Sequence, residues 1–295
     1  MPYIQIHSNS LSLKSRLIKY NIMTKTYAVI GDPIDHSFSP ALHNAAFLFL
    51  GLDCTYIAYR IQKGELESGI EALKKIGVSG FNVTIPHKIN MMKFLNEADN
   101  ECNLVGATNT VVNNNGYLKG YNTDVEGFLD PIRKRKIDPK DSDVLLIGAG
   151  GAARAIIIGF NKEKVHRITI ANRTRERAEE LIRFAQNLGL ESDYLDLQSA
   201  GEIVSKYKFV VNATSVGLKG VGCPISTKNI NKDSIVYDIV YVPVETPLIE
   251  QSKNQGATII YGWEMLLAQA MKSFEIWTNR KAPYDAMKLT LLGRF

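Results

Sequence analysis

The chain has 295 residues, of which 45% are apolar and 22% are charged, a composition typical of a globular protein with one large or two medium domains. It contains no run of about 18 uncharged apolar residues, so the sequence predicts no membrane-spanning helix. The net charge is +5, of which residues 1–22 carry +3, and the remaining +2 argues against a nucleic-acid-binding surface. The 3 scattered cysteines without a CxxC pair predict neither a zinc site nor a disulfide framework. We therefore expect a protein of a reducing compartment, the cytoplasm, that binds no metal.

The first 22 residues differ from the rest because they contain Lys14, Arg16 and Lys19 and no acidic residue. This composition resembles that of a transit peptide, but the segment has few arginines and no clear cleavage site. Met23 opens the stretch MTKTYAVIGDPI, which looks like a natural start. We interpret residues 1–22 as a flexible basic extension or as the product of a mis-called start codon, in preference to a targeting segment.

Strands and helices alternate in the first part of the chain. Apolar residues with a period of two predict strands, and apolar residues at helical spacing predict helices. The first helix has Ser39 as a natural N-cap, Pro40 at its first position and Gly51 as a natural stop. A hairpin is predicted to turn at Asn115–Gly116. The predicted strands are 26–33, 54–61 and 80–85, and the predicted helices are 39–51, 64–77 and 88–98.

The character of the sequence changes near Asp124. From this residue onward, strands alternate with helices, a pattern that predicts parallel β–α–β units. The predicted elements are a strand–turn–helix unit over 143–160, strands at 167–174, 209–217, 234–241 and 257–262, and helices at 125–137, 175–189, 263–279 and 284–292.

A glycine turn lies at the start of this second part. The segment DVLLIGAGGAARA places Gly148, Gly150 and Ala153 in G-x-G-x-x-A spacing between a predicted strand and a predicted helix. The first glycine permits a tight turn, the second lets the backbone approach a pyrophosphate, and the small third residue lets the helix pack on the strand. The alternative is a tight turn without a ligand. The context favours a cofactor site at Gly148, Ala149, Gly150, Gly151, Ala152 and Ala153.

The end of the next predicted strand discriminates between cofactors. A site for NAD would place an acidic residue there to bind the ribose 2′-hydroxyl. This chain instead has Asn172, Arg173 and Thr174, with Arg177 one turn further. Two guanidinium groups and a hydroxyl suit the 2′-phosphate of NADP. In the alternative interpretation, Thr174 only caps a helix and both arginines are solvated.

Several polar residues of the first part are not needed for packing. Lys88 follows the strand-like run GFNVTIP, where its simplest interpretation is a solvated lysine at a helix end. Ser37 and Ser39 lie two residues apart at a helix start, where hydroxyl and N–H groups can bind a carboxylate. Asn109 lies among apolar residues, and Asp124 lies where the two parts meet. Together these residues predict a second polar site.

The motifs carry a resemblance to a known family. The stretches HSFSP, FNVTIPHK, GATNT, YNTD, GAGGAARA, NRT, NATSVG and GWEMLLAQ occur in the order seen in shikimate dehydrogenases, from about Thr26 to the C-terminus. This family reduces 3-dehydroshikimate to shikimate with NADPH in the pathway to aromatic amino acids. The resemblance implies an α/β fold with a substrate domain over 23–123 and 262–295, a Rossmann-type NADP domain over 124–261, and C-terminal helices that return to the first domain.

The resemblance also implies roles for individual residues. Lys88 and Asp124 match the catalytic pair, in which the lysine donates a proton to the oxygen that becomes negative during hydride transfer. The substrate site would contain Ser37 and Ser39 at the carboxylate, Thr84, Asn109 and Gln269 at the hydroxyls, and Tyr241 nearby, with Asn82 as a further candidate. The cofactor site would also contain Asn212, Ala213, Thr214, Ile239, Gly262 and Met265.

Three other functions remain as alternatives. A quinate/shikimate dehydrogenase paralogue using NAD is disfavoured by the two arginines, whereas use of quinate stays open. An inactive NADP-binding regulatory module is disfavoured by the intact Lys88–Asp124 pair, and a folate-type methylene dehydrogenase by the serine pair and Asn109. Val125 replaces the glycine usual in the family after YNTD, which we expect to reshape the domain junction slightly. We expect small-molecule partners only, with no nucleic acid or membrane, and either a monomer or a homodimer.

Overall fold

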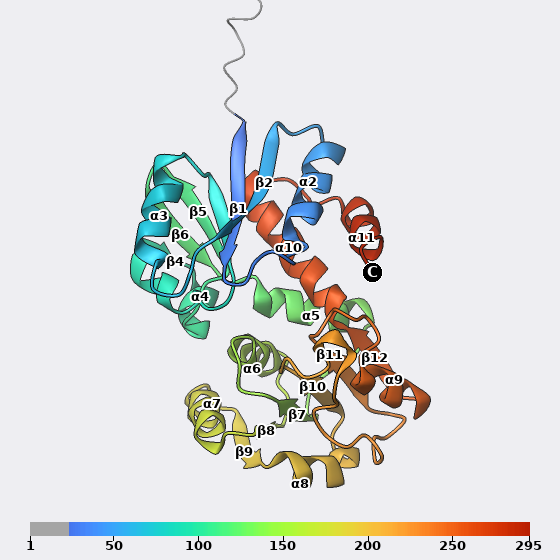
Figure 1. Ribbon diagram of the computed structural model, residues 1–295. Coiled ribbons are helices and arrows are strands. Elements are labelled where there is room, and N and C mark those ends of the chain that lie inside the picture. The colour runs from blue at the N-terminus through green and yellow to red at the C-terminus, as the bar shows by residue number, and fades with distance from the viewer. Residues whose placement is uncertain (1–23) are drawn as a thin grey trace, which may run out of the picture.

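The computed structural model describes residues 24–295, so the extension predicted for residues 1–22 lies outside the described residues. Two six-stranded sheets each form the centre of one lobe, which confirms the predicted α/β architecture (Figure 1). Among the helices of residues 24–295, none is both long and apolar enough to cross a membrane.

The first lobe takes its strands from β1 to β6, and the second takes its strands from β7 to β12. The strands are β1 (Lys25–Gly31), β2 (Cys54–Arg60), β3 (Gly80–Val83), β4 (Glu97–Ala98), β5 (Thr110–Asn114), β6 (Tyr117–Tyr121), β7 (Asp143–Ile147), β8 (Arg167–Ala171), β9 (Glu191–Leu195), β10 (Phe209–Asn212), β11 (Ile235–Asp238) and β12 (Thr258–Tyr261). The α-helices are α2 (Ser39–Phe49), α3 (Leu66–Lys75), α4 (Asn100–Val105), α5 (Asp124–Lys134), α6 (Ala153–Lys162), α7 (Arg175–Asn187), α8 (Leu197–Glu202), α9 (Pro247–Asn254), α10 (Gly262–Thr278) and α11 (Tyr284–Leu292). The 3₁₀ helices within residues 24–295 are η1 (Asn90–Phe94), η2 (Val204–Lys206) and η3 (Leu218–Gly220).

The first sheet is mixed, with the strand order β2-β1-β3-β5-β6-β4. Strands β2 and β3 both run parallel to β1, whereas β5 is antiparallel to its neighbours β3 and β6. The predicted hairpin is confirmed between β5 and β6. Asn115 and Gly116 have φ values of 52° and 93°, the left-handed conformation that a two-residue hairpin turn requires.

The second sheet is parallel throughout, with the order β12-β11-β10-β7-β8-β9. This is the order of a Rossmann fold, in which the direction of winding reverses between β7 and β10. The loops that follow these two strands therefore lie side by side at the carboxyl edge of the sheet, where such folds bind their ligands.

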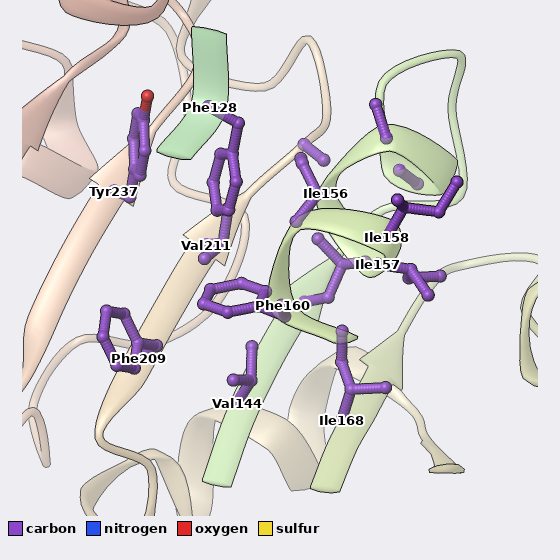
Figure 2. Packing of buried hydrophobic residues seen from close by; sticks show 14 of the residues in the cluster. Phe128, Val144, Ile156, Ile157, Ile158, Phe160, Ile168, Phe209, Val211 and Tyr237 are labelled. Atoms are coloured by element: carbon purple, nitrogen blue, oxygen red, sulfur yellow. The ribbon is translucent and has the colours of Figure 1, made fainter. Parts of the chain in front are cut away.

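Helix α5 begins at the junction and packs into the core of the second lobe. The Phe128 ring stacks on that of Tyr237 at a centroid distance of 4.9 Å and meets Phe160 edge-on at 5.0 Å. Figure 2 shows these rings beside the isoleucines of α6, above the sheet residues Val144 and Val211. The helix that begins with Asp124 is therefore fixed by the buried core of this lobe.

The C-terminal helices return to the first lobe, as predicted. Helix α10 runs from the end of β12 to the first sheet, and α11 lies against α2 (Figure 1). The Trp277 ring of α10 stacks on Tyr27 of β1 at 5.0 Å, and its Nε1 donates to the carbonyl of Val111 at 3.0 Å. Residues late in the chain thereby reach the same lobe as Ser37 and Lys88.

The prediction of a helix over 88–98 is wrong. Only the short η1 forms there, followed by β4, which pairs with β6. Asn96 explains the difference, because its main-chain N–H donates to the carbonyl of Leu118 and its Oδ1 accepts from the Leu118 N–H, at 2.9 and 2.8 Å. These long-range bonds outweigh the local helical pattern. Strand β9 and helices α4, α8 and α9 were also not predicted from the sequence.

Candidate active site

Lys88 and Asp124 form an ion pair at the junction of the lobes. Lys88 follows the turn after β3, and Asp124 is the first residue of α5. Lys88 Nζ lies 2.6 Å from Asp124 Oδ2, and the two side chains are 20% and 8% exposed. The solvated interpretation of Lys88 therefore does not hold, since the ammonium is partly buried against a carboxylate.

Asn109 fixes the other carboxylate oxygen of Asp124. Its Nδ2 donates to Asp124 Oδ1 at 2.8 Å and to Thr123 Oγ1 at 2.9 Å. Its Oδ1 accepts from the main-chain N–H of Thr123 at 2.8 Å, which sets the orientation of the amide. Both oxygens of Asp124 are thus held, one by the amide and one by the ammonium.

A buried polar network lies behind Asn109. Asn82 Nδ2 donates to the Asn109 carbonyl at 2.9 Å and to Ser273 Oγ at 3.1 Å, while Asn82 Oδ1 accepts from the Tyr56 hydroxyl at 2.7 Å. Thr110 Oγ1 lies 2.8 Å from Ser273 Oγ. Asn82 thus acts as internal support for Asn109. Thr110, Tyr56 and Ser273 were not predicted from the sequence, where the only local signal was the run of polar residues around Asn109.

Ser37, Ser39 and Tyr241 lie around the start of α2. The Ser39 N–H donates to Ser37 Oγ at 3.3 Å. Phe38 takes the N-cap position, so Ser39 is the first helical residue and not the predicted cap. The Tyr241 ring, from the loop after β11, lies 5.7 Å from the ring of Phe38, and burial raises the pKa of Tyr241. Two segments of different lobes therefore meet here.

Thr84 and Gln269 are the two remaining residues predicted to bind the substrate hydroxyls. Thr84 lies in the turn that carries Lys88, where its carbonyl accepts from the His87 N–H at 2.9 Å. Gln269 lies where α10 crosses α5, and a Cβ on Gly127 of α5 would lie 2.7 Å from Gln269 Cβ. Only glycine allows this close crossing. The Gln269 Nε2 donates within its own helix, to the Leu266 carbonyl at 2.7 Å.

The glycine turn after β7 has the geometry of a phosphate site. Gly148 has a φ of +105°, and a Cβ there would lie 3.1 Å from the carbonyl carbon of Ala213. At Gly151, by contrast, a Cβ would meet no atom within 4 Å, so the backbone is open to an approaching group. Helix α6 begins directly afterward, with Ala152 as an N-cap that makes no side-chain cap bond. Its N-terminus is available to an anion.

Asn212 shapes the neighbouring loop after β10. Its Nδ2 donates to Asp238 Oδ1 at 2.9 Å and to the Val216 carbonyl at 3.1 Å, and its Oδ1 accepts from Thr214 Oγ1 at 2.7 Å. The Ala213 N–H donates to the Ile147 carbonyl at 2.7 Å. Asn212 and Thr214 are therefore committed to the loop, and the backbone of Ala213 borders the glycine turn.

The residues predicted to select NADP lie at the end of β8. Arg173 and Arg177 are exposed, and neither forms an ion pair with any residue of the described range 24–295. Arg175, which lies between them in sequence, already forms an ion pair, with its Nε 2.8 Å from Glu179 Oε1. Thr174 is the N-cap of α7 but makes no side-chain cap bond, and Asn172 Nδ2 donates to its carbonyl at 2.7 Å. Two free guanidinium groups and a free hydroxyl fit a 2′-phosphate.

The remaining candidates lie where β11 and β12 end. A Cβ on Gly262 would lie 2.6 Å from the Ile239 carbonyl oxygen, so the start of α10 touches the backbone after β11. Met265 is buried one turn further along α10. Ile239, Gly262 and Met265 thus lie at the carboxyl edge of the second sheet, on the side of the glycine turn. In residues 24–295, no group of three or more His, Cys, Asp or Glu side chains is placed to hold a metal ion.

A Rossmann lobe with an open glycine turn, beside a second α/β lobe carrying a lysine–carboxylate pair, defines a nicotinamide-dinucleotide-dependent oxidoreductase. Three family models match the chain: the shikimate dehydrogenase substrate binding domain at residues 29–111, shikimate/quinate 5-dehydrogenase at 132–239, and the shikimate 5′-dehydrogenase C-terminal domain at 262–292. The chain belongs to the shikimate dehydrogenase (NADP⁺) family. It is an NADP-dependent oxidoreductase of the shikimate pathway.

Individual relatives are similar to this chain over almost its whole length. The shikimate dehydrogenase (NADP⁺) of Nitrosopumilus maritimus is 58% identical over 92% of this chain and 100% of its own length. A shikimate dehydrogenase solved in complex with NADP⁺ is 35% identical with a TM-score of 0.86, covering 93% of this chain and 96% of that one. The quinate dehydrogenase of Corynebacterium glutamicum, solved in complex with NAD, is 28% identical with a TM-score of 0.85, covering 92% and 99%.

Proposed function

We propose that this chain catalyses the reversible, NADPH-dependent reduction of 3-dehydroshikimate to shikimate, with Lys88 and Asp124 as its catalytic residues. The observation that carries the proposal is the 2.6 Å contact between Lys88 Nζ and Asp124 Oδ2 at the junction of a substrate lobe and a cofactor lobe. A lysine placed in this way is a hydrogen-bond donor of fixed position in a partly buried site.

NADPH supplies the hydride when it is bound. As the substrate carbonyl is reduced, negative charge develops on its oxygen, and the Lys88 ammonium stabilises that charge and donates the proton. In the reverse direction Lys88 accepts the proton from the substrate hydroxyl. Asp124 holds the ammonium in position, and Asn109 prevents the carboxylate from turning away by binding its second oxygen.

The proposed substrate contacts come from six segments of the chain. Ser37 and Ser39, with the N–H groups at the start of α2, suit the substrate carboxylate because they are donors near a helix N-terminus. Tyr241, whose ring lies 5.7 Å from that of Phe38 between the two serines in sequence, would add a hydroxyl from the second lobe. The hydroxyl groups of the substrate would be bound by Thr84, Asn109, Asp124 and Gln269.

The cofactor contacts come from the carboxyl edge of the second sheet. The pyrophosphate would lie on the backbone from Gly148 to Ala153, and the 2′-phosphate between Arg173, Arg177 and Thr174. Asn212 supports this edge from within. The other bordering residues would be Asn172, Ala213, Thr214, Ile239, Gly262 and Met265.

We assign substrate binding to residues 23–123 and 262–295, and NADP binding to residues 124–261. The packing of α10 and α11 on the first sheet and of α5 in the second core supports these boundaries. We further propose that the enzyme works in the cytoplasm as a monomer or homodimer on small molecules alone, without a nucleic-acid or membrane partner.

A steady-state assay tests the proposal, with shikimate or quinate as substrate and NADP⁺ or NAD⁺ as cofactor. We expect the highest kcat/KM for shikimate with NADP⁺. Quinate bears one hydroxyl group more than shikimate, and the relative that is a quinate dehydrogenase makes it the matched competitor. A higher kcat/KM for quinate would reassign the substrate, and absence of turnover with all four pairs would reject the catalytic role of Lys88.

A further inference from the structure

Three aromatic rings, those of Phe38, Tyr241 and Phe295, form a cluster at the start of α2. The Phe38 ring lies 5.7 Å from the Tyr241 ring, at an interplanar angle of 56°, and 5.6 Å from the Phe295 ring, at 67°. Both distances and both tilts are those that aromatic pairs prefer. Phe38 therefore joins the last residue of the chain to the loop after β11.

This aromatic cluster connects the two lobes. Phe38 packs against the core of the first lobe, which contains Ile34, Leu42 and Leu267. Tyr241, in contrast, belongs to the segment that leaves the second sheet after β11. The Phe38 ring thus contacts the second lobe, and Ser37 and Ser39 are its two neighbours in sequence.

The contact between Phe38 and Tyr241 should affect how tightly the substrate binds. A tyrosine on a loop loses rotamer freedom when it must bind a ligand, and this loss lowers affinity unless the ring is held beforehand. Within residues 24–295, Phe38 is the sole aromatic ring paired with Tyr241. Its removal would leave the Tyr241 side chain without that support.

We propose that Phe38 is a positioning residue, which holds the Tyr241 ring beside Ser37 and Ser39 and thereby sets the affinity for the substrate carboxylate. The Phe295 ring also packs against the Phe38 ring. The inference rests on the proposed function, because substrate binding by Tyr241 is part of it. Phe38 itself donates no hydrogen bond, so its effect should fall on KM for shikimate and not on the chemical step.

The test is a double-mutant cycle of Phe38→Ala, Tyr241→Ala and the double variant, with kcat and KM measured separately for shikimate and NADP⁺. Phe38→Ala should raise KM for shikimate by about 2- to 12-fold, the worth of one aromatic pair, and leave kcat and KM for NADP⁺ near wild type. In the Tyr241→Ala background the same change should have almost no further effect. Phe38→Tyr keeps the aromatic ring, so its KM for shikimate should equal that of the wild type.

Two further variants separate positioning from a general loss of stability. Phe38→Leu keeps the apolar contacts with the first core and removes the ring, so it should fold and still raise KM. Phe49→Ala is the matched control, since Phe49 ends the same helix but is 68% exposed, and it should leave all constants unchanged.

The outcomes distinguish the two proposals. If Phe38→Ala raised KM for shikimate equally in the wild type and in Tyr241→Ala, the positioning role would be overturned. Substrate binding by Tyr241 would not be affected by that result. An unchanged KM for shikimate in Tyr241→Ala, in an enzyme that still turns over shikimate, would instead remove Tyr241 from the proposed site. An unchanged KM for shikimate in Phe38→Leu would show that Phe38 only packs in the core of the first lobe and does not position Tyr241.

Discussion

The Lys88 ammonium and the Asp124 carboxylate are 2.6 Å apart, although they are held by different lobes. Lys88 follows β3 of the first sheet, whereas Asp124 begins a helix whose Phe128 is fixed in the second core. The second carboxylate oxygen accepts from Asn109 of the first lobe at 2.8 Å. The position of the lysine therefore depends on how the two lobes meet, so substitutions on either side of this contact should alter catalysis.

Lys88→Ala should lower kcat by about 10²- to 10⁴-fold, the usual contribution of a positioned acid–base group. KM for shikimate should change little, because the carboxylate and hydroxyl contacts lie on other residues. Separate measurement of kcat and KM decides the role. A pure binding role would raise KM and leave kcat near wild type.

Asp124→Asn should also reduce kcat severely, because it removes the charge that holds Lys88 while it keeps the shape of the side chain. The losses in Lys88→Ala and Asp124→Asn should not add in the double variant, since the two residues act as a unit. Circular dichroism and thermal unfolding provide the control that both variants remain folded. Additive losses in kcat would show that Lys88 and Asp124 act independently.

Arg173→Gln should lower kcat/KM for NADP⁺ by about 10- to 100-fold, because a charged hydrogen bond to the 2′-phosphate is lost. The value for NAD⁺ should hardly change, since NAD⁺ has no such phosphate. Arg175→Gln is the matched control: this arginine already pairs with Glu179 and lies over the Tyr194 ring at 5.3 Å. If both variants lost the same preference, general surface charge and not a specific contact would explain the choice of cofactor.

The double variant Ser37→Ala, Ser39→Ala should bind shikimate weakly and NADP⁺ normally. The Ser37 hydroxyl accepts only one long bond within its segment, at 3.3 Å from the Ser39 N–H, so its loss should cost the fold little. Calorimetry with shikimate and with NADP⁺ measures the two affinities. An unchanged shikimate affinity would restrict the serines to a structural role at the start of α2.

The sequence predicted the features that depend on local pattern. The hairpin at Asn115–Gly116 and the turn at Gly148 both require backbone conformations that favour particular residues, so they can be found from neighbours alone. The helix expected over 88–98 was wrong because Asn96 bonds to Leu118, a partner that no local window contains. Ser273 was missed for the same reason, since it meets Thr110 across 163 positions of the chain.

His43 shows a further limit, because nothing local marks it as buried. It is fully enclosed, it stacks on the Tyr56 ring at a centroid distance of 4.4 Å, and neither ring nitrogen has a hydrogen-bond partner among the described residues. Burial lowers its pKa from 6.5 to about 3. The imidazole is therefore neutral in the folded protein at pH values where the unfolded chain would protonate it.

This difference predicts a pH-dependent stability that a substitution should remove. Between pH about 3 and 6.5 the unfolded chain binds more protons at His43 than the folded protein does, so the free energy of unfolding falls as the pH is lowered through this window. The contribution of one such group is at most about 1.4 kcal/mol for each pH unit. His43→Leu should therefore become more stable relative to wild type as the pH falls from 6.5, and the difference should be constant above it. Urea unfolding of both proteins at several pH values measures this difference.

His166→Gln is the control of opposite sign, because Asp143 raises the pKa of His166. The wild type should therefore gain stability relative to His166→Gln as the pH is lowered. A pH-independent difference between His43→Leu and wild type would show that His43 is accessible to protons in the folded protein.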